Sequence, residues 1–185
     1  MRVSIEKVDE ELLKSIRKLD VENYKECVVG IDWYKDRYKK LEYVAVARST
    51  RGKIIGYEII TGIDKKVFKC YEESLLCGDV SLAPKAYLPI NNSNCLYLAM
   101  MCVSSKYRES GIATKMTEVL LEEVKKNKLG VYKIVAVCTN EVAEKVLKNN
   151  GFRVIGRIGD RSIMWRGCGD DAVRNKERVI FESRK

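Results

Sequence analysis

The segment from Val103 to Lys115 constrains this chain more than any other, because it joins an apolar run over 95–103 to a helical pattern. Arg108 is followed by Gly111 three residues later and by Ala113 two residues beyond that. A strand that turns tightly into a helix leaves the first backbone N–H groups of the helix uncovered, and these groups bind anions with the help of the helix dipole. Gly111 and Ala113 leave room for a diphosphate to reach the backbone, and the guanidinium of Arg108 matches phosphate oxygens. The segment therefore predicts an anion-binding turn.

The residues after this turn follow a helical repeat that ends at Gly130. One face of the predicted helix carries the apolar residues Ile112, Met116, Val119, Leu120 and Val124. The next apolar run, Tyr132 to Cys138, is typical of a strand that is buried on both faces. Such a strand usually runs parallel to a neighbour.

A second helix signal begins at Asn140, whose side chain suits a helix N-cap. Its buried stripe is formed by Ala143, Val146 and Leu147. Gly151 is the expected left-handed stop of this helix, and Phe152 opens another strand.

In these residues the chain resembles the GNAT superfamily of acyl-CoA-dependent N-acetyltransferases. Two motifs carry the resemblance: Arg108-x-x-Gly111-x-Ala113, and then Asn140, Ala143, Gly151 and Phe152 at the spacing of the family. The likeness covers residues 95–158 and extends to a predicted hairpin over 44–57. It implies an α/β (α+β) fold with one central, mixed, mostly antiparallel twisted sheet of about six to seven strands. Helices would cover both faces, and one parallel pair of strands would be splayed.

The resemblance also implies acetyl-CoA as co-substrate and a set of residues that bind it. The pantetheine arm would pair with the backbone edge from Met101 to Val103, and the diphosphate would bind the turn that follows. The implied cofactor-binding residues are Met101, Cys102, Val103, Arg108, Glu109, Ser110, Gly111, Ile112, Ala113, Thr114 and Asn140. Glu109 departs from the basic residues often seen after the motif arginine, and its carboxylate would weaken binding if it pointed at the diphosphate.

The residues for proton transfer depart from the usual family pattern. Leu147 stands where many members carry a tyrosine that protonates the leaving thiolate. Tyr97 stands where some members carry a glutamate base, and a phenol with a pKa near 10 is a poor base at neutral pH. Strand alternation puts Tyr97, Ala99 and Met101 on one face unless a bulge intervenes. Tyr97 is thus the catalytic candidate, as a group that orders water or the amine; the alternative is a strand residue that only packs.

Two functions follow from the resemblance. The first is an N-acetyltransferase that moves an acetyl group from acetyl-CoA to a primary amine by direct attack in a ternary complex. The acceptor amine would belong to a protein N-terminus, a lysine or a small molecule. The second is a non-catalytic acyl-CoA-binding or regulatory module.

Composition narrows the partners. The net charge of +9 suggests an anionic partner, either a phosphate-rich cofactor or nucleic acid, but the Lys and Arg residues are spread along the chain, which argues against nucleic acid. Seven Cys without a CxxC pair, in a chain without His, argue against a metal site and favour free thiols in the cytoplasm. No apolar run approaches the ~20 residues of a membrane span, so no membrane partner is expected. A monomer or a homodimer fits equally.

The remaining segments complete one predicted domain over 1–185. We expect a strand over 2–8 and a helix from Asp9 to Tyr24, with Asp9 as cap and Leu12, Leu13, Ile16 and Leu19 buried. A short helix over 31–40 and strands over 41–47 and 54–60 follow. Residues 64–94 are expected to be an irregular insertion, which either folds over the acceptor site or lies on the surface. The last strand is expected at 162–165 or 178–181.

Overall fold

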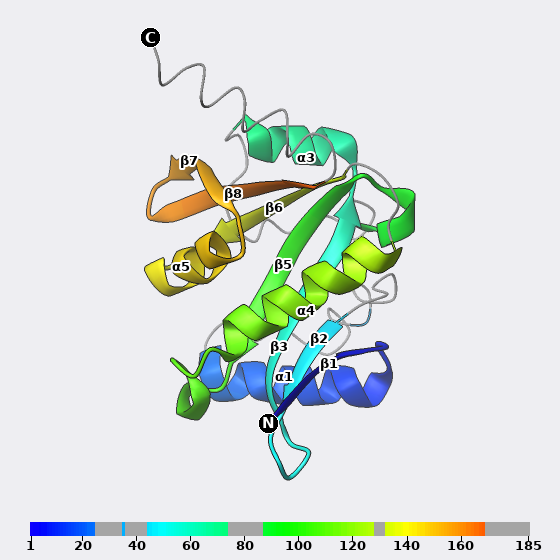
Figure 1. The fold of residues 1–185 in the computed structure, drawn as a ribbon, viewed down its shortest axis with the longest axis vertical. Helices are drawn as coiled ribbons and strands as arrows, with labels where there is room; N and C mark the ends of the chain where they lie inside the picture. Colours follow the sequence, from blue (N-terminus) through cyan, green and yellow to red (C-terminus); the bar gives the residue numbers. More distant parts are fainter. Residues whose placement is uncertain (25–34, 36–43, 74–86, 128–131, 169–185) are drawn as a thin grey trace.

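The computed structural model describes residues 1–24, 35, 44–73, 87–127 and 132–168 (Figure 1). Its elements, in chain order, are β1 Arg2–Glu6, α1 Glu10–Tyr24, β2 Val44–Arg48, β3 Ile54–Ile63, α3 Lys65–Glu72, β4 Tyr87–Leu88, the 3-10 turn η2 Ile90–Asn92, β5 Cys95–Val103, the 3-10 turn η3 Ser105–Tyr107, α4 Ile112–Asn127, β6 Tyr132–Cys138, α5 Glu141–Asn149, β7 Arg153–Ile158 and β8 Arg161–Cys168.

The strands form one eight-stranded sheet in the order β1-β2-β3-β5-β6-β8-β7, with β4 paired to β3 off this path. All pairs are antiparallel except β5 and β6, which run parallel. Helices α4 and α5 cover one face, whereas α1 and α3 cover the other. This arrangement confirms the predicted fold class.

The caps and apolar stripes explain where the helices lie. The Oδ1 atom of Asp9 accepts a 2.7 Å hydrogen bond from the backbone N–H of Leu12, so Asp9 caps α1 as expected. The predicted apolar residues of α1 are all buried against β2 and β3. In α4 the predicted face is buried except for Val119, and Leu121 is buried in addition.

The stretch over 64–94 is not irregular throughout, in contrast to our expectation. It contains α3, an eight-residue helix that begins after Asp64, whose side chain accepts a 2.7 Å hydrogen bond from the N–H of Lys66. Phe68 and Tyr71 lie three residues apart and bury one side of the helix against β5, β6 and β8. This stripe of only two buried residues is short, which is why it was missed within a polar stretch.

Some predictions fall outside the described residues. These are the helix over 31–40 apart from Lys35, the start of the strand over 41–47, residues 74–86 of the predicted insertion, the helix end at Gly130 and the strand over 178–181. Of the two candidates for the last strand, the segment 162–165 lies within β8. None of the described helices is long and apolar enough to cross a membrane.

Candidate functional site

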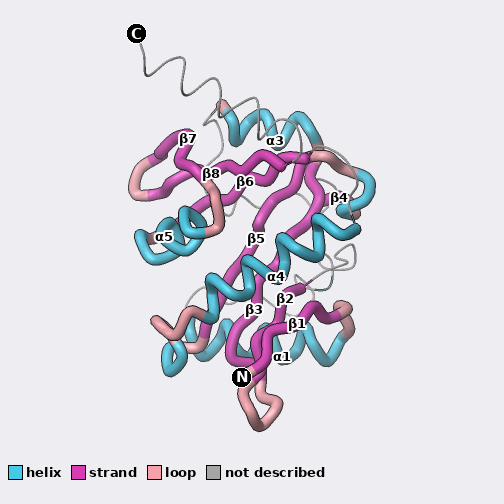
Figure 2. The backbone as a smooth tube through the Cα atoms, viewed as in Figure 1, coloured by secondary structure: helices cyan, strands magenta, loops and turns pink. Residues whose placement is uncertain are grey.

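The parallel strands β5 and β6 are paired along only part of their length. Their register runs from Cys95 opposite Lys133 to Leu98 opposite Ala136, and beyond it the strands run apart (Figures 1 and 2). The gap between Ala99–Val103 and the end of β6 is termed the splay below. It is the feature that the family resemblance implied.

A β-bulge marks the start of the splay. Ile59 on β3 pairs with Met100, whereas Ile60 pairs with Leu98, so Ala99 is the extra residue of β5. Beyond the bulge, the backbone N–H of Ser104 donates a 2.8 Å hydrogen bond to the carbonyl of Ile55 on β3. By antiparallel alternation, Met101 and Val103 then direct their backbone polar groups toward the splay. An extended ligand with amide groups can pair with such an edge.

The bulge corrects the prediction that Tyr97, Ala99 and Met101 share one face. Met101 packs with the cluster under α4, whereas Tyr97 packs with the cluster under α3, on the opposite face. Tyr97 is only 3% exposed, and its ring stacks on Tyr71 with centroids 5.3 Å apart. One inserted residue therefore reverses the side-chain alternation between Tyr97 and Met101.

The turn after β5 has the backbone of an anion site. Glu109 has φ +62° and Gly111 has φ +77°, so both lie in the left-handed region. Helix α4 starts directly afterwards, and its first internal hydrogen bond runs from the N–H of Lys115 to the carbonyl of Gly111, at 3.0 Å. The N–H groups of the preceding first turn have no intrahelical acceptor and point out of the helix end. Arg108 is exposed beside this turn.

Helix α5 begins at the corresponding point after β6. Asn140 caps it, because its Oδ1 accepts a 2.9 Å hydrogen bond from the N–H of Ala143. Since β5 and β6 are parallel, the starts of α4 and α5 lie at the same edge of the sheet. The edge Met101–Val103, the turn Arg108–Thr114 and Asn140 therefore all lie toward the same end of the parallel pair β5 and β6.

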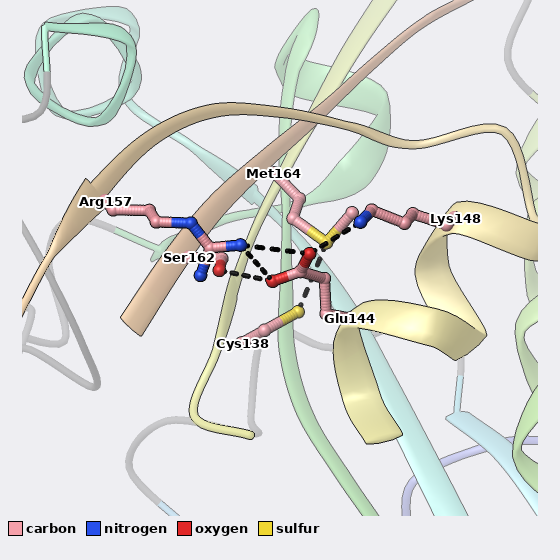
Figure 3. A network of polar contacts seen from close by, with 6 residues as sticks. All are labelled: Cys138, Glu144, Lys148, Arg157, Ser162 and Met164. Carbon is pink, nitrogen blue, oxygen red and sulfur yellow. Dashed lines mark hydrogen bonds and ion pairs between the residues drawn. The ribbon is translucent and has the colours of Figure 1, made fainter. Parts of the chain in front are cut away.

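A polar network fixes α5 to the hairpin of β7 and β8 (Figure 3). The carboxylate of Glu144 accepts hydrogen bonds from Arg157 on β7, at 3.0 Å, and from Ser162 on β8, at 2.5 Å. Lys148 lies 2.7 Å from the same carboxylate. The hydrogen bonds from Lys148 and Ser162 and the charge of Arg157 lower the pKa of Glu144 to about 2. The network holds the start of α5 in place beside the splay.

A second polar group lies on the α1 face of the splay, and sequence analysis missed it. The Tyr57 hydroxyl lies 2.8 Å from both carboxylate oxygens of buried Asp20, and the Tyr24 hydroxyl donates to the carbonyl of Met101 at 3.3 Å. Cys102 is buried beside them, and burial raises the pKa of its thiol to about 12. Burial and the neighbouring Cys102 also raise the pKa of Tyr24. The only signal in the sequence is that Asp20 and Tyr24 share one helix face.

Asn23 connects the C-terminal end of α1 to the 3-10 turn η3, which precedes the turn Arg108–Thr114. Its Oδ1 accepts a 3.1 Å hydrogen bond from the N–H of Ser105. Leu147, in contrast, is buried in the core at 2% exposure, so this position supplies packing and no hydroxyl. Within the described residues, no cluster of three His, Cys, Asp or Glu side chains could hold a metal ion.

Comparisons with known proteins give one consistent result. Residues 65–163, more than half of the chain, match the acetyltransferase (GNAT) domain family. The phosphinothricin acetyltransferase (Pat) of Sinorhizobium meliloti, solved with AcCoA, is 16% identical and has a TM-score of 0.64, covering 92% of this chain and 90% of that chain. The Escherichia coli N-acetyltransferase YhbS, solved with CoA, is also 16% identical, with a TM-score of 0.64 and coverages of 93% and 84%.

The ribosomal-protein-S18-alanine N-acetyltransferase of Escherichia coli is 11% identical, with a TM-score of 0.60 and coverages of 91% and 95%. At these identities the structural likeness shows the fold alone. No curated protein matches the sequence.

Proposed function

Because this chain belongs to the GNAT family of acetyltransferases, we propose that it transfers an acetyl group from acetyl-CoA to a primary amine. The observation that carries the proposal is the splay between β5 and β6 together with the turn Arg108–Thr114 at its end. Residues 1–185 would act as one catalytic domain. The acceptor stays open, since the similar structures are named for acceptors as different as phosphinothricin and an alanine of ribosomal protein S18.

Two parts of the site support acetyl-CoA as the donor. The uncovered N–H groups at the start of α4 and the side chain of Arg108 suit the diphosphate. The backbone groups of Met101 and Val103 that face the splay suit the amides of the pantetheine arm, which would lie along β5 toward the bulge at Ala99. Asn140 would face the same arm from the start of α5.

The reaction needs few groups from the protein. The nitrogen of the neutral amine attacks the thioester carbonyl, so a C–N bond forms and the C–S bond breaks. The sulfur leaves with the electron pair and takes up a proton, while the amine nitrogen loses one. Tyr24 and Cys102 hold their protons at neutral pH, and burial raises the pKa of each further, so neither suits removal of the amine proton. We assign proton removal to water and the main rate gain to alignment of the two substrates.

One observation favours a second candidate, a non-catalytic acyl-CoA-binding module. Leu147 fills the core where many family members place the phenol that protonates the thiolate. Release of CoA thiol from acetyl-CoA in the presence of a panel of amines separates the two functions. Release of CoA thiol that depends on an added amine supports the transferase. Tight binding of acetyl-CoA without release of CoA thiol in the presence of any amine of the panel supports the non-catalytic module.

A further inference from the structure

Glu58 is a fully buried acid in the middle of β3 that the proposed reaction does not use. It is 0% exposed and pairs across the sheet with Ala45 on β2 and Met101 on β5, under α4. Its Oε1 atom lies 3.0 Å from the hydroxyl oxygen of Thr117 on α4. Its Oε2 atom has no hydrogen-bond partner in the described part of the chain. A buried carboxylate with one free oxygen is a costly arrangement, which calls for a different protonation state.

A count of protons supports a neutral Glu58. The Thr117 hydroxyl carries one proton but lies within hydrogen-bond distance of two acceptors, Oε1 of Glu58 at 3.0 Å and the carbonyl of Ala113 at 3.1 Å. If Glu58 carries a proton on Oε1, it donates to Thr117, and Thr117 donates to Ala113. Both short contacts are then hydrogen bonds, which an ionised Glu58 does not permit.

Within the described residues, no charged side chain contributes to the pKa of Glu58, so none there balances a negative charge. Its cross-strand neighbours are Ala45 and Met101, and α4 presents Thr117. On β1 and β2, Glu6 and Arg48 pair with each other, with 2.7 Å between Oε2 of Glu6 and Nη2 of Arg48. Burial raises the pKa of Glu58 to about 8, against a smaller opposing effect of the Thr117 hydrogen bond.

We propose that Glu58 is a positioning residue that, as a neutral acid, holds the first turn of α4 against β3 through Thr117 and Ala113. Ala113 belongs to the turn that we assign to the diphosphate of acetyl-CoA, so this inference rests on the proposed function. Ionisation of Glu58 would take the proton of Thr117 away from Ala113 and place an unpaired charge beneath the helix. The cofactor turn would then lose its fixed position relative to β3.

Calorimetry with acetyl-CoA between pH 6.5 and 9.5 tests the proposal. With a pKa of about 8, only about a tenth of the protein holds a protonated Glu58 at pH 9, so wild-type affinity should fall about tenfold there. Glu58→Gln keeps the shape without the titration and should show a flat profile. Glu122→Gln makes the same change at an exposed position of α4 and should keep the wild-type profile. If both wild type and Glu58→Gln bind acetyl-CoA and their affinities change with pH in the same way, the role of Glu58 is overturned, but the proposed function is not.

Two further measurements test the proposal without the pH profile of acetyl-CoA binding. Thr117→Val should weaken acetyl-CoA binding several-fold at pH 7, and Thr117→Ser, which restores a hydroxyl, should recover most of it. Equal binding by both variants would overturn the relay. No acetyl-CoA binding by wild type at any pH would overturn the proposed function. Urea unfolding without acetyl-CoA would still show whether Glu58 is protonated in the folded protein. Its pKa is about 8 when folded against an ordinary value of 4.5, so the free energy of unfolding of wild type relative to Glu58→Gln should fall as pH rises from 4.5 to 8. A constant difference across that range would show that Glu58 is ionised.

Discussion

The hydroxyl of Tyr24 donates a hydrogen bond to the carbonyl oxygen of Met101, with 3.3 Å between the two oxygens. This contact joins the last residue of α1 to the free edge of β5, across 77 positions of the chain. The carbonyl keeps a second lone pair for a cofactor amide. Tyr24 is 46% exposed, so part of this residue lies open to a molecule bound on the α1 face.

Replacing Tyr24 by Phe should therefore affect the acceptor more than the cofactor. The variant removes one hydrogen bond worth on the order of 1 kcal/mol, so we expect kcat/KM for the amine to fall about fivefold. The acetyl-CoA Kd should change less than twofold, as measured by calorimetry. A tenfold loss of acetyl-CoA affinity with unchanged amine kinetics would place Tyr24 on the cofactor side instead.

Gly111→Asp should abolish acetyl-CoA binding, because it puts a negative side chain at the turn proposed for the diphosphate. The left-handed backbone at φ +77° adds strain of about 1–2 kcal/mol for a residue with a side chain. Gly52→Asp is a matched control, since Gly52 has φ +80° in the hairpin of β2 and β3 and, like Gly111, has open space around a built Cβ. Both variants should lose similar stability in urea, but only Gly111→Asp should lose binding. Wild-type affinity in folded Gly111→Asp protein would refute the assignment of the turn.

Glu109→Gly should strengthen acetyl-CoA binding. Glu109 has φ +62° without being a glycine, and its carboxylate lies in the turn proposed for an anion. Glu109→Gln removes only the charge, so the difference between the two variants isolates the backbone contribution. We expect several-fold tighter binding by both at low salt, with the gain shrinking at high salt because screening weakens the repulsion. Tighter binding by neither variant would mean that the carboxylate points away from the cofactor.

The network of Glu144 predicts a loss of stability in acid. Its pKa is about 2 in the folded protein against an ordinary value of 4.5, so the unfolded state binds the proton more readily. The network therefore contributes its full stability above about pH 4.5 and loses it as the pH falls toward 2. In urea unfolding from pH 7 to 2.5, the difference between wild type and Glu144→Gln should shrink as the pH drops. Glu141→Gln, at an exposed position of the same helix, is the control; a difference from wild type that stays constant for Glu144→Gln would contradict the prediction.

Local patterns predicted much of the fold and the turn between β5 and α4. The caps Asp9 and Asn140, the stop at Gly151 with φ +80° and the buried run of β6 each depend on residues close in sequence. Asn140 follows the parallel strand β6, and the turn Arg108–Thr114 follows its parallel partner β5, so these two features also located the edge of the sheet that carries the candidate site. Local sequence preferences are enough to predict an element when they favour the same structure as the overall fold.

The arrangement of residues on the α1 and α3 faces of β5 depends on contacts that no short pattern contains. The bulge at Ala99 arises from pairing with β3, and it turned the predicted face of Tyr97 away from Met101. The contact between Tyr57 and Asp20 joins positions 37 apart in sequence. A register shift between strands, or the packing of a helix that is distant in the chain, produces no periodic pattern in the sequence. Neither can therefore be predicted from local residues.

Tyr97→Phe tests whether a buried tyrosine in this cluster serves the reaction. Tyr97 lies two residues before the bulge, stacked on Tyr71 of α3. If its hydroxyl orders a water or the amine, the variant should lose on the order of 1 kcal/mol, which is several-fold in kcat. Tyr71→Phe removes a hydroxyl from the other ring of the same stack and should leave kcat unchanged at a similar Tm. Turnover of Tyr97→Phe within error of wild type would make Tyr97 a packing residue. A loss of about a hundredfold or more with a shifted pH profile would make it the general base itself, because that is the size of effect expected when proton transfer is lost.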